Sequence, residues 1–335
     1  MLNIHQIEYY LPKNEVTNDD LSKSNPEWDM QAIKKWTGVS KRFYTDKNQT
    51  ALDIGFKSCE KLLSKIDSLK NKVDGLIFCT QSNDYIMPPN SSLLHGMLGL
   101  SENVFAFDFN LACSGYIYGL ALANGLISTK VAENILLINA DTYSKFINEK
   151  DRSTKVLFGD AAATSYLNVS SNSKGLIDII CSSSGNHSNK IIIPAGGQKK
   201  PKSKKTSIPT KDNNGNIRTQ ENLHMDGLGV FSFVNSKIPK QVNEILARNQ
   251  YNINDIGLFV FHQANKLIID SLTKILKIDP NKVYINIERV GNTVSASIPI
   301  ALKDAQQEGK IRNGDKVLCS GFGTGLSWGT CLLQY

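Results

Sequence analysis

Residues 107–127, FDFNLACSGYIYGLALANGLI, carry the clearest structural pattern in the chain. Alternating apolar residues at the start of the stretch indicate a strand, a short turn of small residues follows, and the rest is a helix pattern. This helix has scarcely a polar face, so protein must cover it on all sides. The stretch therefore predicts a strand, a turn and a buried helix, with Cys113 in the turn.

The bulk composition is that of a globular protein of about two domains or two fused halves. The chain has 335 residues, of which 41% are hydrophobic and 21% are charged. The 21 uncharged residues between Asp108 and Lys130 could nominally cross a bilayer. Because they begin as a strand and include asparagines and serines, a buried helix is favoured and no membrane association is expected.

Cysteine usage and the N-terminus predict a cytoplasmic protein. The six cysteines form no Cys-x-x-Cys pair and no spacing typical of a zinc site, so we expect reduced thiols and no metal. The first residues, MLNIHQIEYYLP, lack the basic and apolar regions of a secretory signal.

The net charge of +7 comes largely from one tract, KKPKSKK at 199–205. Proline and serine interrupt the tract and no aromatic residue lies within it, so we interpret it as a solvated loop and expect no nucleic-acid partner. A basic surface could instead receive an acidic protein that delivers substrate.

Helix and strand periods alternate along the whole chain, which indicates an α/β protein with buried, mainly parallel strands. In the first half we expect strands at 4–11, 75–81, 104–110, 135–140 and 162–169, and helices at 51–69, at 91–98 and from 113. The second half repeats this order, with strands at 175–182, 257–262, 282–287, 316–321 and 326–334, and helices at 230–249, 266–276 and 294–308.

The repeated order predicts two equivalent halves, 1–170 and 171–335, packed about a pseudo-twofold axis. The connection at 186–224 is rich in Gly, Pro, Asn, Ser and Lys and is long for a loop. Connections of this length usually cover a functional site, so we expect a lid or surface flap.

Three polar residues lie where strands of the predicted sheets end. Cys113 follows the strand that ends at Asn110, His262 follows LFVF, and Asn292 lies in the loop ERVGN. Ligands of α/β sheets gather at the carboxyl ends of strands, so these three side chains are the candidate site. The other cysteines are interpreted as small core residues.

A cysteine at a helix N-terminus is well placed to act as a nucleophile. The helix dipole and free N–H groups can lower a thiol pKa from about 8.5 toward neutrality, and the same N–H groups can hold a thioester oxyanion. The glycines of GFGTGLSWG, residues 321–329, precede a strand and not a helix. We therefore interpret them as a hairpin facing the site, since a dinucleotide cradle needs a following helix.

These motifs resemble those of the thiolase-fold condensing enzymes, most closely 3-oxoacyl-[acyl-carrier-protein] synthase III. The resemblance spans essentially the full length and rests on LACSGYIYGL around Cys113, FHQAN around His262 and RVGNTVSASIP around Asn292. It implies an α/β thiolase-like fold, in which two duplicated βαβαβαββ halves form a five-layer αβαβα sandwich.

The resemblance also implies an activity and the roles of the candidate residues. Cys113 would be acylated by a thioester such as acyl-coenzyme A, and a malonyl-carrier thioester would then lose carbon dioxide and attack the acyl group. His262 and Asn292 would stabilise the enolate, and the backbone N–H groups of Cys113 and Thr324 would form the oxyanion hole. Coenzyme A and phosphopantetheine thioesters are then substrates, and no cofactor is implied.

Further positions match substrate-binding residues of the family. Arg152, Asn265 and Lys266 match positions near coenzyme A, and Phe231 matches a residue of the acyl tunnel. Met87 matches the residue that enters the partner's pocket, which implies a homodimer beside an acyl carrier protein partner.

Four positions depart from the family pattern, one of them Lys266, which stands where the family usually has an arginine. Ala32 occupies the place of the usual adenine-stacking tryptophan, although Trp36 lies close by; Ser232 replaces a basic residue and Thr324 a glycine. These departures favour a specialised acyl pathway as much as fatty-acid initiation.

Two alternatives remain open on the sequence alone. A cysteine-dependent acyltransferase would pass the acyl group from Cys113 to an amine or alcohol and release no carbon dioxide. A non-catalytic docking partner of a carrier protein would form no acyl adduct on Cys113 at all.

Overall fold

Two mixed β-sheets form the framework of the computed structural model, which describes residues 2–170 and 174–335. The first sheet has five strands in the order β1-β7-β6-β4-β5. Their bounds are β1 Leu2–Tyr10, β4 Gly75–Cys79, β5 Phe105–Phe109, β6 Asn134–Asp141 and β7 Ala161–Val169. All five come from the first half of the chain.

The second sheet repeats four positions of the first, in the order β13-β14-β15-β8. Its strands are β8 Gly175–Ser183, β13 Leu258–Phe261, β14 Lys316–Gly323 and β15 Ser327–Gln334. In each sheet two antiparallel pairs are followed by a parallel pair, β6 with β4 and β14 with β13. The predicted duplication of the element order is confirmed.

The predicted strand at 282–287 is wrong. Val283 forms one parallel bridge with Phe259, at the place that β5 holds in the first sheet. Three residues later the backbone N–H of Asn286 donates to the Gln263 side chain at 3.0 Å instead of to a strand, and helix α9 (Ile287–Val290) begins. A side-chain acceptor thus ends the ladder after one residue pair.

The expectation of mainly parallel strands is also wrong. Only β4–β5, β4–β6 and β13–β14 are parallel among the neighbours in the two sheets. β6 and β7 are joined without a long crossover helix, and β14 and β15 by a short turn, so both pairs must be antiparallel.

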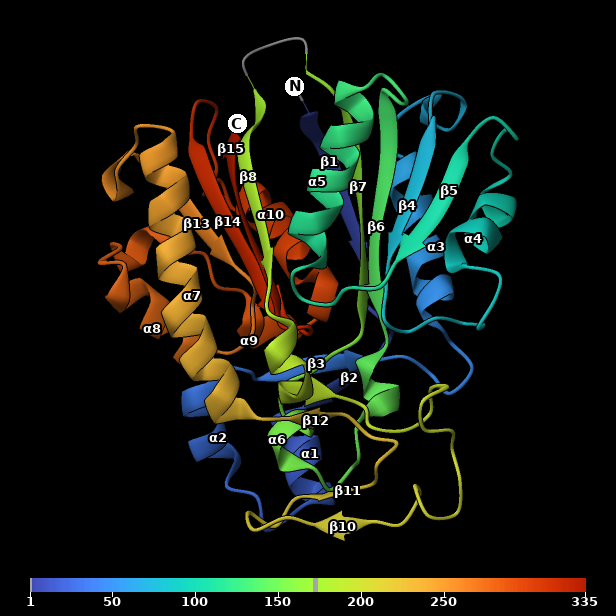
Figure 1. The fold of residues 1–335 in the computed structure, drawn as a ribbon, viewed down its shortest axis with the longest axis vertical. Coiled ribbons are helices and arrows are strands. Elements are labelled where there is room, and N and C mark those ends of the chain that lie inside the picture. Colours follow the sequence, from blue (N-terminus) through green and yellow to red (C-terminus); the bar gives the residue numbers. More distant parts are fainter. Residues whose placement is uncertain (1, 171–173) are drawn as a thin grey trace.

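Helices form three layers around the two sheets (Figure 1). The central layer is α5 (Gly115–Ser128) and α10 (Ser297–Gln307), whose buried residues share one core with residues of both sheets. The outer layers are α3 (Ala51–Leu63) with α4 (Asn90–Leu98), and α7 (Gly227–Arg248) with α8 (Lys266–Ile275). This is the five-layer αβαβα arrangement expected for the chain.

Short elements that the sequence patterns did not predict gather below the sandwich in Figure 1. They are β2 Asn14–Thr17, α1 Asn18–Ser24, α2 Met30–Thr37, β3 Lys41–Tyr44, α6 Arg152–Lys155, β9 Ile191–Ile192, β10 Thr210–Lys211, β11 Ile217–Arg218 and β12 His224–Met225. Single 3-10 turns lie at Leu69–Asn71, Tyr143–Phe146, Gly185–Lys190, Ile253–Asp255, Pro280–Lys282 and Val294–Ala296. These elements are too short to show a sequence period.

The boundary expected between residues 170 and 171 touches residues 171–173, which lie outside the described residues. On either side, β7 ends at Val169 and β8 begins at Gly175. The division into halves 1–170 and 171–335 stays a prediction, supported by the separation of the two sheets along the chain.

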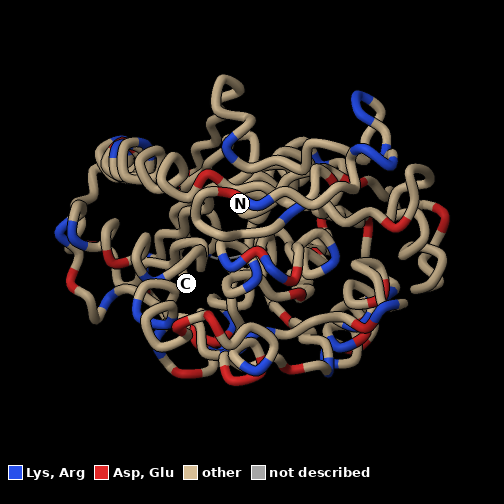
Figure 2. The backbone as a smooth tube through the Cα atoms, turned by 90° about the horizontal axis from the view of Figure 1, so that it is seen from below, with Lys and Arg blue, Asp and Glu red and all other residues tan. Residues whose placement is uncertain are grey.

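The surface carries interspersed charge over most of the face seen in Figure 2. Residues 199–205, the basic tract, are all exposed, as expected of a solvated loop. Cys181 is exposed on β8, so its interpretation as a core residue is wrong, whereas Cys59, Cys79, Cys319 and Cys331 are buried. No helix within residues 2–170 and 174–335 is long and apolar enough to cross a membrane.

Helix α5 is buried on one side only, since Leu122 is 41% exposed, so the expectation of cover on all sides is wrong; two of its glycines allow close packing on the buried side. A Cβ added to Gly115 would lie 2.3 Å from Cys79 Sγ, and one added to Gly119 would lie 2.7 Å from Leu137 Cδ1. A Cβ on Gly125 would meet no atom within 4 Å. The helix therefore approaches β4 and β6 through its first two glycines and faces open space at the third.

This difference predicts opposite effects of alanine at two positions of one helix. Gly125→Ala is expected to raise the free energy of unfolding by about 0.5–1 kcal/mol, because alanine favours helix without a clash. Gly119→Ala is expected to lower it by about 1–3 kcal/mol, because Leu137 must move. Denaturant unfolding of both variants checks this, and equal effects would contradict the packing described.

Candidate active site

Cys113 is buried in the turn between β5 and α5, against the backbone of β14. A Cβ added to Gly323 would lie 2.9 Å from Cys113 Cβ and 3.2 Å from its Sγ, and one added to Gly321 would lie 2.7 Å from the Cys113 carbonyl oxygen. Only glycines let the backbone come this close. The first and second sheets therefore meet at the candidate nucleophile.

The expected fall in the pKa of the Cys113 thiol is wrong. Burial raises the pKa of Cys113 above its ordinary value, and the nearby Asp141 carboxylate raises it further. The helix begins only at Gly115, with Ser114 as the N-cap, so the sulfur precedes the first turn and lies in an apolar cluster. The resting side chain is a neutral thiol, and its proton must leave during the reaction.

His262 follows β13 and is held by a contact on each side. Its Nδ1 is 2.6 Å from Ser297 Oγ, and its ring lies edge-on to Phe322 with 5.5 Å between centroids. Burial lowers the pKa of His262 to about 3. The imidazole is therefore neutral at physiological pH, and within the described part of the chain its Nε2 is left for a ligand.

Asn292 is tied to the loop that carries His262. Its Nδ2 donates to the carbonyl oxygen of Ala264 at 3.3 Å, and its Oδ1 accepts from Val294 N at 3.0 Å. Val294 has φ 53°, a left-handed conformation that a β-branched residue adopts only when its surroundings impose it. Among the described residues, the second amide proton of Asn292 has no acceptor and remains to be donated.

Asp141, at the end of β6, connects this loop to the first sheet. Ser295 Oγ donates to Asp141 Oδ2 at 2.5 Å, and Gln81 N donates to Asp141 Oδ1 at 2.8 Å. Burial raises the pKa of Asp141 to about 7. No pattern in the sequence predicts this link, because a lone aspartate at a strand end fits many roles.

The structure brings the three candidate residues to one region between the sheets. Cys113, Phe322 and Val294 belong to one buried cluster, His262 packs on Phe322, and Asn292 bonds both Val294 and the His262 loop. Residues far apart in the sequence thus converge, Cys113 and His262 after strands β5 and β13; Asn292 instead follows helix α9, so its predicted place at a strand end is wrong.

Thr324 lies in the turn between β14 and β15. Ser327 Oγ donates to the Thr324 carbonyl oxygen at 2.7 Å and is 2.7 Å from Ser114 Oγ, beside the nucleophile. Thr324 does not have a positive φ, whereas the next residue, Gly325, has φ 131°. The replacement of glycine at position 324 is therefore accommodated without backbone strain.

Several predicted substrate-binding residues lie where α2 meets α8. Trp36 is 37% exposed, and a Cβ on the nearby Gly38 would lie 2.8 Å from Lys266 Cβ. Asn265 caps α8 by accepting from Ile268 N at 2.8 Å, and Lys266 pairs with Asp270 on the same helix. Trp36, Asn265 and Lys266 therefore share one surface.

The remaining predicted residues are placed apart from this group. Arg152 is half-buried at the start of α6, and Phe231 is half-buried in α7 against the cluster that contains Cys113. Met87 is 78% exposed and does not line the cavity beside Cys113. A role for Met87 therefore needs a second chain.

A cavity of about 320 Å³ beside the Cys113 turn contains residues that the sequence reading missed. Its lining residues are Gln81, Asn110, Tyr143, Phe146, Ser188, Ile191, Ile192, Ile193, Leu223, Thr324 and Gly325. Five of these come from the connection at 186–224, which supports the expectation that this segment covers a site. Phe231 does not line this cavity.

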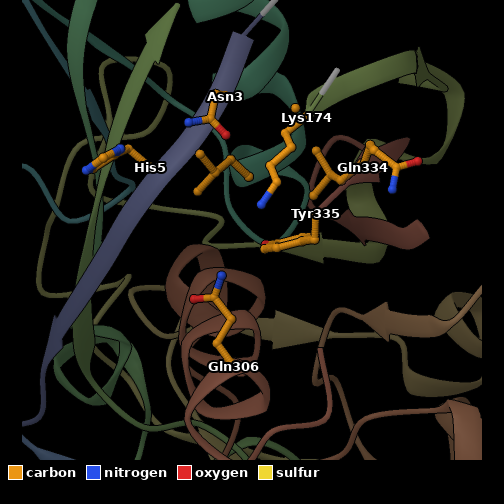
Figure 3. Close-up of a pocket in the computed structure, with 9 residues that line it drawn as sticks. Asn3, His5, Lys174, Gln306, Gln334 and Tyr335 are labelled. Atoms are coloured by element: carbon orange, nitrogen blue, oxygen red, sulfur yellow. The ribbon is translucent and has the colours of Figure 1, made fainter. Parts of the chain in front are cut away.

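A second cavity, of about 330 Å³, lies at the other end of the sheets. Lys174, Gln306 and Tyr335 surround it together with the start of β1 (Figure 3). β14 runs toward Cys113 and β15 runs away from it, so this cavity is remote from the nucleophile. Within residues 2–170 and 174–335 no group of three His, Cys, Asp or Glu could hold a metal ion.

The buried neutral state of His262 predicts a dependence of stability on pH. The unfolded histidine binds a proton near pH 6.5, whereas the folded one binds it only near pH 3, so stability is lost as the pH falls between these values. His262→Asn should remove about 1.4 kcal/mol per pH unit from the slope in this range. Denaturant unfolding from pH 6.5 to 3.5 measures it, and an unchanged slope would contradict the buried neutral state.

Comparisons with known proteins agree on one family. The family model described as "3-Oxoacyl-[acyl-carrier-protein (ACP)] synthase III" matches residues 107–185. The model of the C-terminal part of the same family matches residues 246–335. The chain is 34% identical over 338 residues to the beta-ketoacyl-[acyl-carrier-protein] synthase III of Fusobacterium nucleatum subsp. nucleatum, covering 100% of this chain and 98% of the relative.

Solved structures agree with the sequence comparisons. A crystal structure of a 3-oxoacyl-(acyl-carrier-protein) synthase III at 35% identity covers 100% of this chain and 99% of its own, with a TM-score of 0.97. The corresponding enzyme of Aquifex aeolicus VF5 covers 100% of both chains at 31% identity, with a TM-score of 0.85. By sequence and by fold, the chain belongs to the 3-oxoacyl-[acyl-carrier-protein] synthase III family.

Proposed function

We propose that the chain joins an acyl thioester to malonyl-[acyl-carrier protein] by decarboxylative condensation, through an acyl group on Cys113. The products are a 3-oxoacyl carrier, coenzyme A and carbon dioxide. The observation that carries the proposal is the convergence of a buried thiol, a neutral imidazole and a free amide proton at the meeting of the two sheets, in a chain of this family.

In the first step the Cys113 sulfur attacks the thioester carbonyl carbon. A bond from Sγ to this carbon forms, the bond to the coenzyme A sulfur breaks, and the thiol proton ends on coenzyme A. The backbone N–H groups of Cys113 and Thr324 would hold the carbonyl oxygen as it becomes negative. Because the resting thiol is neutral, proton loss accompanies the attack, and the departing coenzyme A sulfur takes up this proton.

In the second step the malonyl thioester loses carbon dioxide and becomes an enolate. Its oxygen would accept hydrogen bonds from His262 Nε2–H and Asn292 Nδ2–H. If the Ser297 hydroxyl donates to Nδ1, the tautomer with a proton on Nε2 is fixed. The enolate carbon then attacks the acyl carbonyl, and the Cys113 sulfur leaves as the carbon–carbon bond forms.

The substrate sites extend this proposal to surfaces outside the buried centre. Trp36, Asn265, Lys266 and Arg152 would contact coenzyme A and the pantetheine arm, and Phe231 would line the passage to Cys113. Met87 and its exposed neighbours Tyr85 and Ile86, 60% and 94% exposed, would enter the site of a second copy in a homodimer.

The chemistry needs no resident cofactor, and an acyl carrier protein and an acyl-coenzyme A are its partners. All six cysteines are free, which suits the reducing cytoplasm. Transfer of the acyl group to an amine or alcohol, and docking without catalysis, are less well supported, because a family that condenses acyl groups matches both the Cys113 and the Asn292 regions.

The experiment combines isotope release with intact mass. Acyl-coenzyme A and malonyl carrier labelled at the free carboxyl are incubated with the protein, and labelled carbon dioxide and the mass of the protein are measured. We expect an acyl adduct and one carbon dioxide per 3-oxoacyl product. In Cys113→Ser both should fall by about a thousandfold or more, since a hydroxyl is a much weaker nucleophile.

Cys181→Ser is the matched control, because Cys181 is an exposed cysteine that does not line the cavity. It should keep the wild-type adduct and product. An adduct without release of carbon dioxide would refute condensation, and undiminished activity of Cys113→Ser would refute the nucleophile.

A further inference from the structure

The cavity beside Cys113 has one apolar wall and one polar wall. Phe146, Ile191, Ile193 and Leu223 are among its apolar lining residues, whereas Tyr143, Gln81 and Asn110 supply a hydroxyl and two carboxamides. An acyl chain made only of hydrocarbon can pack against the apolar wall but cannot form hydrogen bonds with the polar wall. The second wall therefore bears on which acyl group this chain accepts.

The polar wall is a hydrogen-bonded row. Tyr143 O–H donates to Gln81 Oε1 at 2.5 Å, and Gln81 Nε2 donates to Asn110 Oδ1 at 2.8 Å. Gln81 is fixed further by its backbone N–H, which donates to the buried Asp141 at 2.8 Å. The row is thus held rigidly from β6 to the end of β5.

The row ends in donors that the described residues leave unpaired. Each carboxamide carries two N–H groups, and the structure shows a partner for only one of the four, from Gln81 to Asn110. Turning either amide group by 180° exchanges which group donates and which accepts in the row. Hydrogen-bonding groups of the two carboxamides still remain without a partner among the described residues. Gln81 is half-buried and Asn110 is exposed, so water satisfies these groups in the free protein, and an acyl group that displaces this water must replace its hydrogen bonds.

The row lies close to the Cys113 turn, although Cys113 itself does not line the cavity. Asn110 precedes Cys113 by three residues, Tyr143 belongs to the same buried cluster as Cys113, and Thr324 both lines the cavity and follows Gly323, which contacts the sulfur. An acyl group on Cys113 that extends into this cavity would therefore meet Tyr143, Gln81 and Asn110.

We propose that the acyl group loaded onto Cys113 is short and carries a neutral oxygen substituent, a hydroxyl or a carbonyl, that Gln81 and Asn110 bind. This inference rests on the proposed function and names its substrate class. A plain alkyl chain would displace water from the unpaired N–H groups without replacing its hydrogen bonds. An oxygen substituent restores them.

The size of the cavity and the charge of its lining residues restrict the class of acyl group further. A cavity of about 320 Å³ has room for roughly ten water molecules of about 30 Å³ each, so it suits a short acyl group. Its lining residues include no lysine or arginine. A carboxylate substituent would therefore lose its hydration without gaining a counter-charge, and a neutral oxygen is favoured.

The test compares acyl donors of matched length on the wild-type protein. Butyryl-, 3-hydroxybutyryl- and succinyl-coenzyme A are offered separately, and kcat/KM for formation of the Cys113 adduct is measured by intact mass. The 3-hydroxybutyryl donor is expected to exceed each of the other two by about tenfold or more, the effect of about one satisfied hydrogen bond.

Gln81→Leu removes the side-chain amide at similar size and keeps the backbone N–H that bonds Asp141. It should bring the ratio of 3-hydroxybutyryl to butyryl donors close to one. Gln307→Leu, the same change at an exposed position of α10, should keep the wild-type ratio. Asn110→Ala, at an exposed residue, repeats the test if Gln81→Leu does not fold.

The outcomes separate this inference from the proposed function. Adducts that form equally well from butyryl and 3-hydroxybutyryl donors, or a Gln81→Leu variant that folds and keeps the preference, would overturn the substrate class and leave the acyl-Cys113 step intact. Absence of an adduct from all three donors and from acetyl-coenzyme A would overturn both.

Discussion

The close contact between the β14 backbone and the Cys113 turn is the constraint on which the rest of the structure depends. Gly321 and Gly323 lie on one face of β14, where any Cβ would fall within 3 Å of the Cys113 residue. The second sheet can therefore dock on the first only without side chains at these positions. Phe322, between these glycines, lies in the same buried cluster as Cys113, and His262 packs on Phe322.

Burial at this contact determines the electrostatics of the site. It raises the pKa of Cys113 and lowers that of His262 to about 3, so both resting groups are neutral. An ionised thiolate is therefore not stored in the folded protein, contrary to what the position at a helix start predicts. Negative charge develops only as the substrate reacts, and backbone N–H groups and the Asn292 amide can then stabilise it by hydrogen bonds.

The sequence predicted the helices and strands whose pattern is long and regular. It also predicted the polar residues that directly follow some of these strands. Helix α5 and the positions of Cys113 and His262 after strands β5 and β13 followed from periodicity alone, whereas Asn292 follows helix α9 and not the strand that the pattern predicted. The strand at 282–287 failed because one side chain, Gln263, captures the backbone that would have extended it. The sequence patterns did not predict the polar wall of Gln81, Asn110 and Tyr143. Its residues are far apart in the sequence and come together only in the folded chain.

Acylation of a Gly323→Ala variant is the most direct test of the claim that β14 docks on the nucleophile. Its Cβ would crowd Cys113 Cβ at 2.9 Å, whereas in the control Gly96→Ala the added Cβ meets nothing within 4 Å. We expect Gly323→Ala to fold but to acylate Cys113 at least about tenfold more slowly, because displacement of a reacting atom is costly. Acylation of folded Gly323→Ala at the wild-type rate would contradict the account.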